Sequence, residues 1–147
     1  MRIERLDPVA PGDKLGIAVK TYYITGTSRG LGRAMAVELL KDRGSRVFGI
    51  GRTCTITNAR YRHLFLDLIA TESVRQFKFQ LPRRTESAVL INNAGVVAPA
   101  APVGSLDNLT LVAGFAVNLV SPAILMNNFI RDTQRFHAER LIVNISS

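Results

Sequence analysis

The segment YYITGTSRGLGRA, residues 22–34, decides the fold class of this chain. It passes from aromatic and β-branched residues typical of a strand, through three glycines, into a run typical of a helix. Gly26, Gly30 and Gly32 have the spacing G-x3-G-x-G. Small residues at these positions permit a tight turn, so that backbone amides and the positive end of the helix dipole can approach a phosphate group. Taken alone, the glycines could equally mark a close packing joint between a strand and a helix.

Short β-rich runs alternate with helical ones along the rest of the chain. We predict a first helix from about residue 30 to 43, capped by Gly44, and a shorter helix that the Thr71 hydroxyl caps and that runs through residues 72–79. This alternation is typical of an α/β fold with a parallel sheet and crossover helices. The predicted strands are residues 21–25, 46–50, 62–66, 88–92 and 140–145.

The apolar segment at residues 109–130 is long enough to be considered as a membrane span. Its polar residues, among them Asn118 and Pro122, argue against that interpretation. We favour a helix that lies between the sheet and a second protein surface, such as a dimer partner. The loop at residues 96–105 follows the fourth predicted strand, at the edge where doubly wound sheets bind ligands.

Length and composition indicate one folded domain at residues 21–147, preceded by a flexible extension at residues 1–20. The extension carries charges and prolines where a signal peptide needs an apolar run, so we expect a cytoplasmic protein without a membrane anchor. The single cysteine, Cys54, allows no internal disulfide. With only His63 and His137 beside it, no spacing builds a zinc site.

The net charge of +8 could attract nucleic acid, an anionic membrane or a phosphorylated cofactor. The arginines are spread along the chain, without a basic helix, an aromatic RNA-binding pattern or a zinc finger. Nucleic-acid binding is therefore an alternative motivated by charge alone, and we expect no nucleic-acid partner.

The end of the second predicted strand indicates which phosphorylated cofactor fits. The sequence there is GIGRT, with Gly51 and Arg52 where an NAD-binding protein places an acid for the ribose 2′-hydroxyl. Arg29, in the glycine turn, and Arg52 can converge on a 2′-phosphate, with Thr53 as an additional hydroxyl donor. We therefore predict NADP(H) in preference to NAD(H).

Five motifs in order resemble the classical short-chain dehydrogenase/reductases. They are TGTSRGLG at 25–32, LDL at 66–68, NNAG at 92–95, VNL at 117–119 and IVNISS at 142–147. Within that family the segments YYITGTSRGLG and GIGRT are most similar to the sepiapterin reductase and bacterial benzil reductase branch. The resemblance implies a Rossmann-type doubly wound parallel sheet, present here in incomplete form with about five strands.

The resemblance also implies roles for individual residues. Asp67 would meet the adenine ring with Leu68 beside it, and Asn118 would hold a water in the proton relay. Ser147 would be the catalytic serine, hydrogen-bonded to the substrate carbonyl oxygen. As single residues, Asp67 and Asn118 could instead be ordinary hydrogen-bonding groups, and Ser146 and Ser147 could merely end a strand. The remaining cofactor contacts fall on the glycine turn and on the NNAG motif, at Gly26, Thr27, Ser28, Arg29, Gly30, Leu31, Gly32, Asn92, Ala94 and Gly95.

The family's reaction moves a hydride to a carbonyl carbon while a tyrosine supplies a proton, its pKa lowered by a lysine four residues later. The tyrosines here are Tyr22, Tyr23 and Tyr61, and none has a lysine four residues later. We therefore expect the amino-terminal part of a longer, homo-oligomeric reductase of a small carbonyl compound, inactive by itself. The alternative is a non-catalytic NADP(H)-binding module or sensor that acts with a partner chain.

Overall fold

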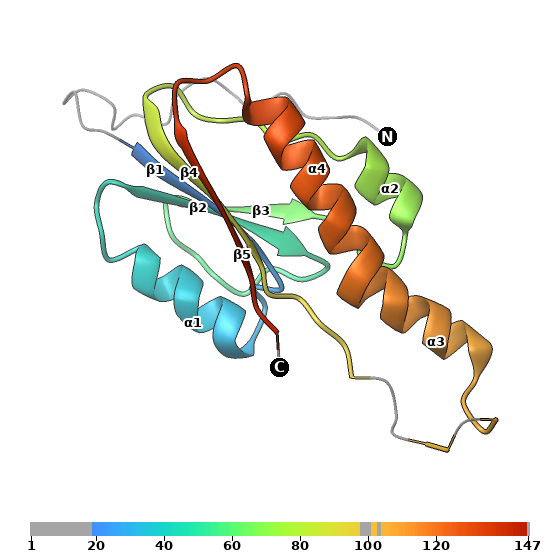
Figure 1. Ribbon diagram of the computed structural model, residues 1–147. Coiled ribbons are helices and arrows are strands. Elements are labelled where there is room, and N and C mark those ends of the chain that lie inside the picture. Colours follow the sequence, from blue (N-terminus) through green and yellow to red (C-terminus); the bar gives the residue numbers. More distant parts are fainter. Residues whose placement is uncertain (1–18, 98–100, 103, 147) are drawn as a thin grey trace.

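The computed structural model describes residues 19–97, 101–102 and 104–146, and its centre is one parallel sheet (Figure 1). The strand order is β3-β2-β1-β4-β5, and every neighbouring pair is parallel. All five predicted strands are present, each within three residues of its expected bounds. The strands are β1 (Val19–Thr25), β2 (Ser45–Gly51), β3 (Tyr61–Phe65), β4 (Thr85–Asn92) and β5 (Glu139–Asn144).

The first strand begins two residues earlier than predicted, inside the segment assigned to the amino-terminal extension. Val19 and Lys20 belong to β1, where Lys20 pairs with Ser45 on one side and Ser87 on the other. The remainder of the predicted extension, residues 1–18, lies outside the described residues.

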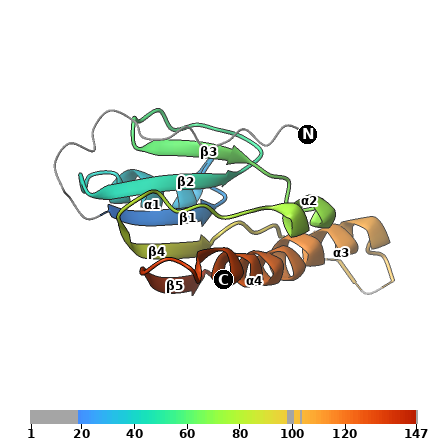
Figure 2. The same cartoon turned by 90° about the horizontal axis from the view of Figure 1, so that it is seen from above.

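Helices cover both faces of the sheet, which makes the fold doubly wound (Figures 1 and 2). One face packs against α1 (Gly30–Leu39), which contributes Ala36 to a core that includes Ile24 and Val47. The opposite face carries α2 (Thr71–Gln76) and a long helix made of α3 (Asn108–Phe115), the π-helical turn η1 (Ala116–Val120) and α4 (Ser121–Thr133).

The core on the second face is built around aromatic rings. Tyr23 of β1 stacks on Phe48 of β2, with ring centroids 4.8 Å apart. Phe79 meets Tyr23 and Phe129 edge to face, at 4.9 and 5.3 Å. Aromatic pairs of this geometry add to the stabilisation from apolar burial, so the cluster fixes α4 against the middle of the sheet.

The predicted carboxyl-terminal cap of the first helix is wrong. Helix α1 ends at Leu39, and Gly44 does not have the positive φ of a glycine cap. The Asp42 carboxylate instead accepts hydrogen bonds from the Gly44 amide at 2.9 Å and the Ser45 hydroxyl at 3.2 Å. Such a side-chain turn offers the backbone an alternative to another helical turn, and the chain leaves the helix four residues early.

The predicted cap of the second helix is also wrong. Thr71 is the first helical residue of α2, the residue before it is Ala70, and no side chain caps the helix. The helix ends at Gln76, because Phe77 adopts an extended conformation that directs the chain toward the buried Phe79.

The long apolar segment is helical, as predicted. By length and composition, residues Asn108–Thr133 could cross a membrane, with a mean hydropathy of 2.0 over the most apolar window. The core helix of a soluble protein passes the same test, so one such helix is weak support for a span. In this fold α4 is packed on the sheet through Leu125 and Phe129, which are both fully buried.

Candidate functional site

The candidate site lies at the carboxyl edge of the sheet, where the strand order reverses. From β1 the chain proceeds outward through β2 and β3, then returns to place β4 and β5 on the other side of β1. The loops after β1 and β4 therefore diverge from neighbouring strand ends. In open α/β sheets this switch point is where ligands bind.

The three glycines of the turn after β1 are each required by its geometry. Gly26 and Gly30 have positive φ values of 75° and 58°, which side-chain-bearing residues rarely adopt. A Cβ on Gly32 would lie 2.3 Å from the Gly26 carbonyl oxygen and 2.4 Å from Nδ2 of Asn93. Gly32 thus lets α1 pack directly against the turn. The turn is therefore a close packing joint between strand and helix, and it also leaves the amino end of the helix open.

The amino end of α1 fits a phosphate. No side chain caps the helix at Arg29, and no acidic residue lies in its first turn. The first amides of a helix have no partner within it, and they carry the positive end of the helix dipole. A Cβ built on Gly30 would meet nothing within 4 Å, so this end faces open space. These residues fit the pyrophosphate of a nicotinamide dinucleotide.

Two residues that the sequence analysis missed join the turn to the loop after β4. The Thr25 hydroxyl oxygen accepts from the amides of Asn93 and Ala94, both at 2.9 Å. The Asn93 side chain donates to the carbonyl oxygens of Thr25 at 3.0 Å and Gly26 at 3.3 Å. The one local signal for these two residues is the position of Asn93 inside the NNAG motif.

The predicted cleft residues of the NNAG motif divide into two groups. Ala94 and Gly95 lie at the edge, and Ala94 is so close to the turn that a Cβ on Gly26 would lie 3.0 Å from its Cα. Asn92 is only 5% exposed, and its Nδ2 donates to Oδ1 of Asn144 across the β4–β5 pair at 2.9 Å. Asn92 therefore fastens the ends of two strands in this structure.

The predicted 2′-phosphate residues lie on two loops that are bonded to each other. Arg29 is exposed in the glycine turn, and Arg52 and Thr53 are exposed just after β2. The Thr55 hydroxyl donates to the Ser28 carbonyl oxygen at 2.8 Å. This contact, together with the Gly26 amide that donates to the Ile50 carbonyl at 2.8 Å, brings the two loops to one part of the edge.

Asp67 and Leu68 lie in the loop after β3. The Asp67 carboxylate accepts from the Ile69 amide at 3.0 Å, which closes a turn before α2. Leu68 is buried, and its carbonyl oxygen accepts from the Ser121 hydroxyl at 2.6 Å. The loop is thus attached to the first residue of α4, and the predicted adenine contact of Asp67 stays a prediction.

Asn118 lies in the π-helical turn and holds the loop that follows β4. Its Oδ1 accepts from the Val96 amide at 2.9 Å, and its Nδ2 donates to the Val96 carbonyl oxygen at 2.8 Å. π-Helical turns are rare and are frequently found at functional sites. Ser147, the predicted catalytic serine, lies outside the described residues.

A surface groove of about 540 Å³ lies away from this edge, between α2 and α4. Its lining includes Arg75, Asn128 and Arg131, and none of the glycine-turn residues. The uncapped helix end and the bonded loops lie at the switch point instead, which makes that edge the candidate cofactor site.

A comparison of the sequence with protein-family models agrees with the order of motifs and with the sheet topology. Residues 20–147 match the family model described as short chain dehydrogenase. The chain belongs to the short-chain dehydrogenase family. Members are oxidoreductases that bind NAD(P) and act on small molecules, and they are commonly oligomeric.

The sequence is similar to curated relatives and to solved structures of the family. It is 34% identical over 142 residues to the (S)-benzoin-forming benzil reductase of Bacillus cereus, covering 88% of this chain and 57% of that protein. The crystal structure of a short-chain dehydrogenase/reductase from Burkholderia vietnamiensis superposes with a TM-score of 0.75 at 26% identity, covering 88% of this chain and 64% of that one.

A metagenomic short-chain oxidoreductase solved in complex with NADP superposes with a TM-score of 0.70 at 25% identity, covering 89% of this chain and 63% of that one. The similarity to benzil reductase agrees with the predicted branch. The chain spans about half the length of the curated relatives it matches.

Proposed function

We propose that this short-chain dehydrogenase chain is the cofactor-binding part of an NADP(H)-dependent reductase of a small carbonyl compound. The open, uncapped amino end of α1 carries the proposal, because it offers unpaired amides to a phosphate beside the switch point. The benzil reductase relatives support a carbonyl substrate, since their name states that chemistry.

The preference for NADP(H) rests on the charges around the predicted 2′-phosphate position. Arg29 and Arg52 are exposed on loops that the Thr55 to Ser28 hydrogen bond holds together. The segment at residues 51–58 contains no acidic residue that would repel a phosphate or bind a ribose 2′-hydroxyl. The solved relative with bound NADP supports the same choice.

In the proposed reaction the nicotinamide, when bound, supplies a hydride to a carbonyl carbon. The amides of residues 30–32 would hold the phosphates, and Ser147 would donate a hydrogen bond to the substrate oxygen. Asn118 uses one N–H and one oxygen lone pair on Val96, which leaves one of each for a water. The 147 residues contain no Tyr-x-x-x-Lys, so we propose that they bind the cofactor without turnover.

A second candidate function is a non-catalytic NADP(H)-binding module or sensor that acts with a partner chain, since the glycine turn and the open end of α1 would serve such a module equally. We further propose a cytoplasmic location and, for the whole reductase, a homo-oligomer. Exposed apolar residues on the long helix, including Val112, Phe115 and Leu119, support an oligomer.

The decisive experiment is a titration of the purified protein with NADPH and NADH, followed by fluorescence. We expect NADPH to bind about tenfold or more tightly, and Arg52→Ala to remove most of that preference. Arg83→Ala is the matched control, because Arg83 is also exposed but precedes β4 at the opposite edge of the sheet. Equal affinity for both nucleotides would contradict the NADP(H) assignment.

Turnover tests the role of the missing tyrosine, and the length of the native gene product separates the two candidate functions. We expect no oxidation of NADPH by the 147-residue chain with aromatic diketones or pterin aldehydes. Oxidation at ordinary enzyme rates would show that the proton comes from a group other than the expected tyrosine. A native gene product of about 16 kDa would favour the binding module, and a longer product containing Tyr-x-x-x-Lys would favour the reductase.

A further inference from the structure

A tyrosine on the third strand contacts the glycine turn directly. Tyr61 is the first residue of β3, and its hydroxyl lies 2.8 Å from Oγ1 of Thr27. Thr27 stands between Gly26 and Ser28, inside the turn that would hold the cofactor phosphates. The two residues are 34 positions apart and on elements separated by β2, so the contact is tertiary.

A missing side chain on β2 makes this contact possible. A Cβ on Gly49 would lie 2.0 Å from the Tyr61 hydroxyl oxygen and 2.3 Å from Thr27 Oγ1. Glycine weakens the interior of a strand, and where it occurs it often marks a close approach of other groups. The hydroxyl groups of Tyr61 and Thr27 occupy the space that a side chain at residue 49 would otherwise fill.

Burial makes Thr27 dependent on Tyr61. Thr27 is 1% exposed, and the Tyr61 hydroxyl is the hydrogen-bond partner that the structure gives its side chain. A buried hydroxyl that loses its partner carries the cost of desolvation without compensation. Partial burial also raises the pKa of Tyr61, which keeps its hydroxyl protonated and able to donate.

We propose that Tyr61 is a positioning residue for the cofactor, which holds Thr27 and thereby the conformation of the glycine turn. Tyr61 acts through Thr27, while the backbone amides that begin α1 make the contact with phosphate. The inference rests on the proposed function, since it assigns the purpose of the turn to nucleotide binding. It adds a residue outside the family motifs, contributed by the start of β3.

The test compares Tyr61→Phe with Tyr22→Phe. Tyr22 is a close control, because Tyr22, Val47 and Tyr61 occupy one row across β1, β2 and β3, and both tyrosines pack on the same core. We expect Tyr61→Phe to weaken NADPH binding about 3- to 10-fold and Tyr22→Phe to leave it unchanged. In the free protein, amide hydrogen exchange at residues 26–32 should accelerate only in Tyr61→Phe.

Substitutions at Thr27 test the route of the effect. Thr27→Val should weaken NADPH binding as Tyr61→Phe does, and the double variant should be no weaker than either single one. Thr27→Ser keeps the hydroxyl and should retain most of the affinity. A lower melting temperature of Tyr61→Phe with unchanged NADPH affinity and unchanged exchange would overturn the positioning role.

The wild-type titration separates this inference from the function on which it rests. Wild-type protein that binds no nicotinamide nucleotide would overturn both. Wild-type binding with an equal affinity in Tyr61→Phe would overturn the role of Tyr61 alone.

Discussion

The two ends of the long helix differ in the opposite sense to their environments, because the more apolar end, α3, is exposed and the more polar end, α4, is packed on the sheet. α3 contains no buried residue, and Leu109, Val112 and Phe115 are each more than 60% exposed. α4 buries five residues, among them Leu125 and Phe129, which are fully buried. Only α4 lies across the sheet, whereas α3 extends past its carboxyl edge (Figure 1). Hydropathy along a chain therefore does not show which part of a helix has a surface to pack on.

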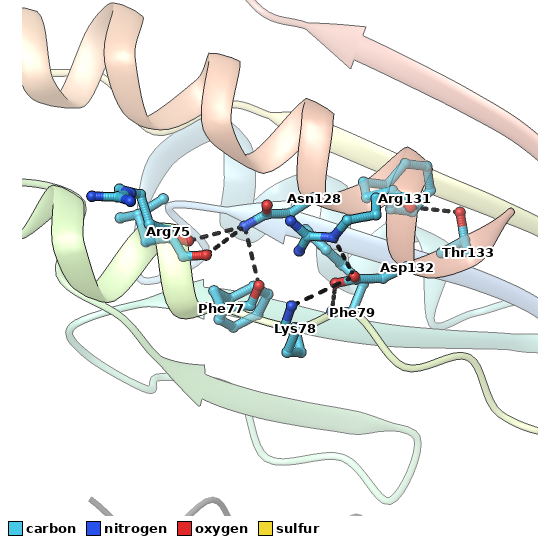
Figure 3. A network of polar contacts seen from close by, with 10 residues as sticks. Arg75, Phe77, Lys78, Phe79, Asn128, Arg131, Asp132 and Thr133 are labelled. Carbon is cyan, nitrogen blue, oxygen red and sulfur yellow. Dashed lines mark hydrogen bonds and ion pairs between the residues drawn. The ribbon is translucent and has the colours of Figure 1, made fainter.

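Polar residues of α4 are also buried and form hydrogen bonds to other parts of the fold. Asn128 is 2% exposed and donates through Nδ2 to the carbonyl oxygens of Val74 and Phe77, both at 3.1 Å (Figure 3). Asp132 accepts from the Phe79 amide at 3.0 Å. These contacts tie α4 to the end of α2 and to the segment that leads into β4, so they set the position of the whole layer.

The largest expected effect is on the aromatic core of α4. Phe129→Ala should lower the free energy of unfolding by about 4 kcal/mol, because it removes a fully buried ring and leaves a cavity beside Tyr23 and Phe79. Phe115→Ala on α3 should change it by about 0.5 kcal/mol or less. Urea unfolding of both variants checks the contrast, and equal costs would show that α3 is buried in solution.

A smaller effect is expected at Asn128. Asn128→Ala should cost about 2 kcal/mol, since the carbonyl groups at the end of α2 lose a buried donor. Asn127→Ala is the control, because Asn127 is the exposed neighbour on the same helix. Thermal unfolding monitored by circular dichroism gives the difference, and similar melting temperatures for the two variants would contradict the role of Asn128 in holding the end of α2 against α4.

A substitution on α3 should raise the free energy of unfolding, whereas those on α4 lower it. Gly114→Ala places a methyl group where nothing lies within 4 Å, and alanine favours the helix by about 0.5 to 1 kcal/mol. We expect a small gain in unfolding free energy by urea titration. A loss would mean that α3 is covered closely by another surface in solution.

The smallest expected effect on stability is at Asp107, which immediately precedes α3. The Asp107 carboxylate accepts from the Thr110 amide at 2.8 Å, and this hydrogen bond lowers its pKa below the ordinary 3.8. Its stabilising contribution is present above that ordinary value and is lost as the pH falls through the lower folded pKa. Asp107→Asn should flatten this acid dependence slightly, which unfolding at several pH values between about 2 and 5 would detect. Glu86→Gln, an exposed control, should not.

The strands were the most predictable part of the fold. Each is a short run rich in β-branched, aromatic or other apolar residues, and β1, β2 and β4 have consecutive buried positions on both faces, so the pattern is visible in the local sequence. Helix ends were less predictable. The end of α1 depends on the Asp42 side chain, and α2 begins at Thr71 itself without a side-chain cap.

The candidate site was predictable where a motif is local and was missed where a contact crosses the sheet. Gly26, Gly30 and Gly32 could be identified because their spacing is specific to a turn before a helix. Thr25 and Asn93 are 68 residues apart, and nothing in either local sequence indicates that their atoms meet. The contact between Tyr61 and Thr27 likewise cannot be predicted from the local sequence, because it depends on the pairing of β3 with β2.

The π-helical turn at 116–120 changes how the long helix should be described. A π-helical turn holds one residue more than an α-helical turn, and one residue corresponds to a rotation of about 100°. α3 and α4 are therefore out of phase, and a single helical wheel drawn over residues 108–133 mixes two faces. An insertion of one residue has in effect re-aimed half of the helix, and the asparagine at the junction, Asn118, is the residue that reaches the loop after β4.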